Sequence, residues 1–196
     1  METKRHLHTS VSPWFYIGLS IAVMLIPIPW VISWVLAATV HECFHLIGIF
    51  LTGERIESIN LGLYGAKIQT EFSKTSHEVL TAAAGPLGSA ILILFARWMP
   101  RVALCGFVQA IGNLMPIYPL DGGRVLSGIL RDLFPHSGER ITSILQIAML
   151  MLISGIGFYI VYRYGWGLLA VLWPVALAAR TGKIKIPCKQ RGLRVQ

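Results

Sequence analysis

Long apolar runs without charged residues dominate this chain. A helix that crosses a bilayer needs about 20 mainly apolar residues, and the runs predict six such spans. They cover Pro13–Pro29, Trp30–Leu51, His77–Trp98, Val102–Tyr118, Ile141–Tyr162 and Trp166–Ala179. We expect Thr75-Ser76-His77-Glu78 to open the third span as a capping box. The pattern predicts an all-α polytopic membrane protein with about six transmembrane helices.

One connection between these runs has a different period. In Ile56–Phe72, apolar and polar residues alternate on both sides of the step Tyr64-Gly65. Alternation with period two around a turn residue is typical of a β-hairpin. An ordinary polar loop explains the pattern equally well. The sequence therefore leaves open whether a small β-hairpin or sheet lies between the second and third helices.

Composition agrees with a membrane protein. Of the 196 residues, 55% are hydrophobic and only 13% are charged, whereas about 25% of residues are charged in a typical soluble domain. The length suits one membrane-embedded domain over residues 1–196, with a core at 13–180, a basic tail at 181–196 and no C-terminal regulatory domain. Three cysteines without CxxC spacing suggest neither a disulfide framework nor a thiolate zinc site.

The net charge of +8 is explained by the membrane rather than by nucleic acid. Basic residues concentrate in cytoplasmic loops of membrane proteins. With six spans and a cytoplasmic N-terminus, fourteen of the 17 basic residues fall on the cytoplasmic side. We therefore expect both termini in the cytoplasm and no nucleic-acid partner.

The second span carries three ionisable residues in the segment His41-Glu42-Cys43-Phe44-His45. Side chains four apart lie on one face of a helix, so both imidazoles can bind one zinc ion while Glu42 acts as a base. Charged residues at bilayer depth are costly and usually functional. The alternative is a set of buried polar residues that hydrogen-bond to a neighbouring helix. Cys43 is expected to point away from the site.

A catalytic zinc usually has three protein ligands, and Asp121 is the best candidate for the third. It follows Pro116 and Pro119, which would break the fourth span, and it precedes Gly122-Gly123, which permits a sharp turn. Broken helices are tolerated in membranes where they are buried in protein or line a cavity. An aspartate that merely caps a helix at the interface remains an open alternative.

Together these motifs resemble the site-2 protease family of intramembrane zinc metalloproteases. The resemblance rests on His41–His45, on Asn113–Arg124 (NLMPIYPLDGGR) and on the small-residue motif Ala84–Gly88 (AGPLG), and it covers roughly residues 30–130. The layout is most similar to the branch that contains stage IV sporulation protein FB. Members of that branch often carry a C-terminal regulatory domain, and this chain ends at Gln196 without one.

The resemblance implies a set of roles. His41, His45 and Asp121 would bind one Zn²⁺ per chain, and Glu42 would act as general base. Asn113 would lie near the substrate or oxyanion, although a hydrogen bond between helices explains it almost as well. Tyr64 and Gly65 belong to a hairpin whose edge could pair with an extended substrate. The glycines of Ala84–Gly88 are interpreted as scaffold, because small residues let helices approach closely.

The function implied is cleavage of a membrane-associated protein near the cytoplasmic face of a bacterial cell membrane, with a sporulation transcription-factor precursor as one candidate substrate. Membrane-embedded regulatory or inhibitory partners are compatible with this function. Two alternatives come from other classes. A metal-binding transporter could use the same ligands, although the spans show no repeat symmetry, and an inactive homologue could serve as a membrane scaffold.

Overall fold

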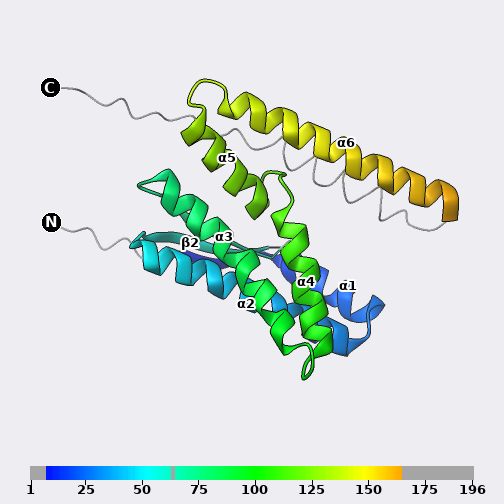
Figure 1. The fold of residues 1–196 in the computed structure, drawn as a ribbon. Coiled ribbons are helices and arrows are strands. Elements are labelled where there is room, and N and C mark those ends of the chain that lie inside the picture. Colours follow the sequence, from blue (N-terminus) through cyan, green and yellow to red (C-terminus); the bar gives the residue numbers. More distant parts are fainter. Residues whose placement is uncertain (1–7, 63–64, 165–196) are drawn as a thin grey trace, which may run out of the picture.

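The computed structural model describes residues 8–62 and 65–164, which form six α-helices, one 3₁₀ helix and three strands (Figure 1). In chain order these are β1 (His8–Val11), α1 (Pro13–Leu25), α2 (Ile28–Thr52), β2 (Ile56–Gly62), β3 (Gly65–Thr70), α3 (Thr75–Ile91), η1 (Leu92–Phe95), α4 (Pro100–Leu114), α5 (Asp121–Leu133) and α6 (Gly138–Tyr164). The mostly helical prediction is confirmed.

Within residues 8–62 and 65–164, three stretches are long and apolar enough to cross a membrane: Ile28–Thr52, Thr75–Phe95 and Gly138–Arg163. They match the second, third and fifth predicted spans. Helices α1 and α4, with 13 and 15 residues, are shorter than a usual span. The predicted sixth span, Trp166–Ala179, and the basic tail lie outside the described residues. The count of six spans therefore stays a prediction.

The described part of the chain buries polar residues and exposes apolar ones. Ser33, Gln109, Thr142 and Gln146 are buried, whereas Met24, Phe50 and Leu94 are 75–85% exposed. Large exposed apolar surfaces mark contact with a membrane or a partner. Polar and small residues between helices are typical of bundles surrounded by lipid. The packing therefore suits a lipid environment.

Helices α2, α3 and α4 pack together, and α3 lies between α2 and α5 (Figure 1). Small residues allow the closest approach: a Cβ added to Gly88 of α3 would lie 2.4 Å from Cγ of Phe44 on α2. Helix α6 packs chiefly on α5. The contacts leave α3 at the centre of the arrangement.

The predicted hairpin exists and belongs to a three-stranded sheet of order β1-β2-β3. Strands β2 and β3 are antiparallel, with Gly62 opposite Gly65 across the loop. Strand β1 pairs with β2 in parallel and had no counterpart in the sequence prediction. The outer strands of this sheet are thus β1 and β3.

The prediction of a capping box at the start of α3 is wrong. The residue before the helix is Lys74, and no side chain caps it. Glu78, expected to fold back onto the helix end, instead points to arginines of α5. Near the helix start, Oε1 of Glu54 accepts hydrogen bonds from the backbone N–H of Ser73 (3.0 Å) and its hydroxyl (2.5 Å), and lies 2.7 Å from Nδ1 of His77. These contacts lower the pKa of Glu54 to about 2.

Helix α4 ends at Leu114, four residues before the predicted end of the fourth span. Pro116 and Pro119 follow, and prolines in a helix interior kink or break it because they lack the N–H and clash with the preceding turn. The peptide bond between Tyr118 and Pro119 is cis. Helix α5 then begins at Asp121, so the break predicted from the prolines is confirmed and is followed by a helix that was not predicted.

Candidate metal centre

Helix α2 carries two histidines on its buried face. His41 and His45 are 5% and 8% exposed, and their four-residue spacing places them one turn apart. Nε2 of His41 lies 3.2 Å from Nε2 of His45. The spacing in the sequence places both residues on one face, and the orientation of the rings brings the two nitrogens together.

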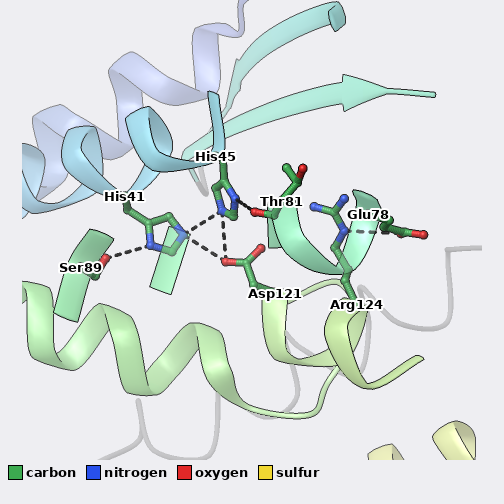
Figure 2. A network of polar contacts seen from close by, with 7 residues as sticks. All are labelled: His41, His45, Glu78, Thr81, Ser89, Asp121 and Arg124. Atoms are coloured by element: carbon green, nitrogen blue, oxygen red, sulfur yellow. Dashed lines mark hydrogen bonds and ion pairs between the residues drawn. The ribbon is translucent and has the colours of Figure 1, made fainter. Parts of the chain in front are cut away.

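Asp121 reaches the histidines from the far side of the proline-broken segment. It is the first residue of α5 and is buried. Its Oδ2 lies 3.1 Å from Nε2 of His41 and 3.3 Å from Nε2 of His45 (Figure 2). The structure therefore brings together the three predicted ligands as one buried group.

The Nδ1 atoms of both imidazoles, which lie on the side away from Asp121, contact α3. Nδ1 of His45 lies 2.8 Å from the backbone carbonyl oxygen of Thr81. A carbonyl only accepts, so Nδ1 carries the proton and Nε2 of the neutral ring has a bare lone pair. Nδ1 of His41 lies 2.9 Å from the Ser89 hydroxyl, which can accept in the same way.

With both rings in this tautomer, three acceptor atoms converge without a hydrogen between them. Two nitrogen lone pairs and a carboxylate oxygen 3.1–3.3 Å apart repel one another unless a cation lies among them. Ligand atoms around a tetrahedral zinc, each bound at about 2.0–2.1 Å, are separated by about 3.3 Å. The donor types and their spacing fit zinc with three protein ligands.

The other residues expected at the site lie as follows. Glu42 is half-buried on α2 and has no hydrogen-bond partner among the described residues. Asn113 is half-buried near the end of α4. Gly65 is the exposed first residue of β3, with φ of 107°, and Tyr64 lies outside the described residues. Cys43 is exposed and does not belong to the ligand group.

Sequence reasoning missed the residues of α3 that surround the ligands. Thr81 and Ser89 contact the two rings, and Gly85 lies against both. Arg124, one turn after Asp121, lies 3.9 Å from Glu78 (Figure 2). Its guanidinium also lies over the ring of Phe72. The sequence does show small and polar residues at helical spacing along α3. That spacing does not indicate a contact with the histidines until α3 is known to pack beside α2.

A scan of protein-family models finds no match to this chain, and a search of curated proteins finds none either. Among solved structures, the chain is similar to a site-2 protease from Methanocaldococcus jannaschii. The TM-score is 0.63 and the identity is 18%, with 87% of each chain covered. The described architecture is therefore the fold seen in that site-2 protease.

Proposed function

We propose that this protein is an intramembrane zinc metalloprotease. The observation that carries the proposal is the buried triangle of His41, His45 and Asp121, whose possible ligand atoms all lie within 4.8 Å of one another. The similarity of fold to a site-2 protease supports it independently.

Zinc bound by three protein ligands acts as a Lewis acid that lowers the pKa of water and polarises a carbonyl group. In the proposed reaction Glu42 removes a proton from the attacking water and delivers it to the leaving amine. Glu42 suits this role because it adjoins His41 and lacks a hydrogen-bond partner among the described residues that would occupy its carboxylate. Asn113 is proposed as a polar contact for the substrate.

The depth of the site supports access for water from the cytoplasmic side. His45 precedes Thr52, the last residue of α2, by seven residues, which is roughly 10 Å at 1.5 Å per residue. In the proposed orientation both termini are cytoplasmic, and peptide bonds are cut close to that face. The candidate substrates are membrane-associated proteins, including the transcription-factor precursors implied by the sporulation-type resemblance.

A substrate must be extended before its carbonyl groups become accessible, since a helix binds them internally. Strand β3 supports this step because it is an outer strand of the sheet. An outer strand offers unpaired backbone groups to an added strand. The other outer strand, β1, has only four residues whereas β3 has six, so we assign substrate pairing to β3, beginning near Gly65.

The experiment compares wild-type protein with Glu42→Gln, which keeps the shape of the side chain but removes the base. Each is expressed in the same host, and newly formed N-termini in the membrane fraction are quantified by mass spectrometry. We expect new termini near membrane-spanning segments with wild type, and their loss with Glu42→Gln while bound zinc is retained. Equal cleavage by both proteins would refute the mechanism.

The same comparison distinguishes the two alternative functions. A transporter would keep metal uptake in Glu42→Gln, and an inactive scaffold would produce no new termini with either protein.

A further inference from the structure

Helix α3 contributes no ligand to the metal centre, yet one of its faces contacts both histidines. Glu78, Thr81, Gly85 and Ser89 are spaced by three, four and four residues, so they lie on one face of the helix. We call this face the α3 support face. Figure 2 shows Thr81 and Ser89 beside the two histidines, and Glu78 beside Arg124.

Ser89 contacts His41. Its residue is fully buried, and its hydroxyl lies 2.9 Å from Nδ1 of the ring. Helix α4 holds it there: a Cβ on Gly106 would come within 2.7 Å of the Ser89 carbonyl oxygen, so the two backbones are in close contact. When the hydroxyl accepts the Nδ1 proton, Nε2 of the neutral His41 ring is bare and faces Asp121. Partners of this kind orient metal-binding histidines.

Gly85 lies against the inner nitrogens. A Cβ at this position would be 2.2 Å from Nε2 of His45 and 2.9 Å from Nε2 of His41. It would also be 2.4 Å from Cε1 of His45. A methyl group there would therefore clash with the His45 ring and displace it. The interpretation of Gly85 as scaffold alone is too narrow, because its missing side chain leaves room for a ligand ring.

The other two members, Thr81 and Glu78, act on His45 and on the helix that carries Asp121. The Thr81 carbonyl accepts the Nδ1 proton of His45. Glu78 pairs with Arg131 at 3.2 Å and approaches Arg124 at 3.9 Å, both on α5. Since α5 begins with Asp121, these pairs help to fix the helix that presents the carboxylate. Ser89 and Thr81 thus contact the two histidine ligands directly, and Glu78 contacts the helix that carries the third.

We propose that the α3 support face sets the affinity and geometry of the metal site, with Ser89 as the positioning residue for His41 and Gly85 as the residue that leaves room for the His45 ring. This inference rests on the proposed zinc centre. It adds a function for a helix that supplies neither a ligand nor the base.

The test measures metal binding rather than proteolysis. Purified full-length protein in detergent is titrated with zinc against a chromophoric chelator, and the visible spectrum of the cobalt-substituted protein is recorded. We expect Ser89→Ala to weaken zinc binding by about 10–100-fold, the usual effect of losing such a partner, and to alter the cobalt spectrum. Gly85→Ala should bind zinc more weakly still.

Two substitutions serve as matched controls on α6. Ser143→Ala removes an exposed hydroxyl that bonds to the Glu139 carbonyl of its own helix, and Gly155→Ala adds a methyl group with nothing within 4 Å. Both should bind zinc like wild type. Thermal unfolding of the metal-free proteins separates lost affinity from lost folding, and Ser89→Ala decides the question if Gly85→Ala does not fold.

The outcomes distinguish this inference from the proposed function. If wild type binds zinc and Ser89→Ala binds it equally well with an unchanged cobalt spectrum, the role of the support face is refuted and the zinc centre stands. If wild type itself binds no zinc, the zinc centre is refuted, and the inference with it.

Discussion

The Nδ1–H of His45 donates a hydrogen bond to the backbone carbonyl of Thr81 over 2.8 Å. A backbone carbonyl can accept a hydrogen bond but cannot donate one, so this contact fixes both the rotation of the ring and its tautomer. The metal-facing Nε2 is thereby oriented before any ion binds. Because the carbonyl belongs to α3, the position of one ligand on α2 depends on the packing of two helices.

The first turn of α5 gives a stability prediction. A Cβ on Gly122 would lie 2.1 Å from the Leu114 carbonyl oxygen, so Gly122→Ala must displace the turn that begins with Asp121. We expect it to destabilise the protein by about 1–3 kcal/mol, as overpacking usually does, and to weaken zinc binding. Thermal unfolding in detergent and zinc titration measure the two effects.

The matched control for that substitution is Gly112→Ala in α4, where nothing lies within 4 Å of the added methyl group. Alanine favours a helix over glycine by up to about 1 kcal/mol, so this variant should be as stable as wild type or slightly more stable. If Gly122→Ala has the same unfolding temperature and the same zinc affinity as the control, the close packing of α5 is contradicted.

Glu54 predicts a specific pH dependence of stability. Hydrogen bonds from Ser73 and a contact with His77 lower its pKa from 4.5 to about 2. A carboxyl group whose pKa is lower in the folded state stabilises the protein above its unfolded pKa. That contribution is lost as the pH falls from about 4.5 towards 2.

The measurement is the unfolding temperature between pH 6 and pH 2 for wild type, Glu54→Gln and the control Glu57→Gln. Glu57 is exposed on β2. Wild type and Glu57→Gln should lose stability through the acidic range more steeply than Glu54→Gln, which has no carboxylate to protonate there. Parallel curves for all three proteins would show that the Glu54 contacts do not contribute.

The ion pairs of Glu78 predict that removing its charge lowers the free energy of unfolding by a small, salt-dependent amount. Arg131 is 44% exposed at its side chain and Glu78 is 25% exposed, and pairs of this kind contribute about 0.2–1 kcal/mol. Glu78→Gln should therefore destabilise the protein within that range at low salt and less in 1 M NaCl. The control Glu57→Gln, exposed on β2, should have no effect.

Charge reversal gives a stricter test of the same pairing. Glu78→Lys should be worse than Glu78→Gln because it places a third positive charge beside Arg124 and Arg131. Adding Arg131→Glu to Glu78→Lys should restore part of the stability. If the double variant is no better than Glu78→Lys alone, the two side chains are not coupled.

The sequence predicted the parts of the site that depend on local geometry. His41 and His45 share a helix face because of their spacing, and the prolines after Leu114 imply a break wherever the helix packs. Asp121 could be chosen as the third ligand because a carboxylate beside such a break can turn inward. In the fold, the alternation in Ile56–Phe72 was enough to suggest the hairpin that became β2 and β3.

What the sequence did not predict depends on tertiary contacts. Ser89 and Gly85 look like ordinary small residues of a membrane helix until α3 is placed against α2. Strand β1 has only four residues and is defined by its pairing with β2. Glu78 matched a capping box by spacing, but the arginines of α5 offer it charged partners that local sequence cannot reveal.

The most direct test of the central claim is the zinc content of the purified protein, measured by mass spectrometry of the metal after extensive dialysis. Wild type and Asp132→Asn, an exposed position on the same helix as Asp121, should each retain about one zinc per chain. Asp121→Asn, which keeps the side-chain shape but loses the charged ligand, should retain far less. Wild-type protein without zinc, or Asp121→Asn with as much zinc as wild type, would contradict the account.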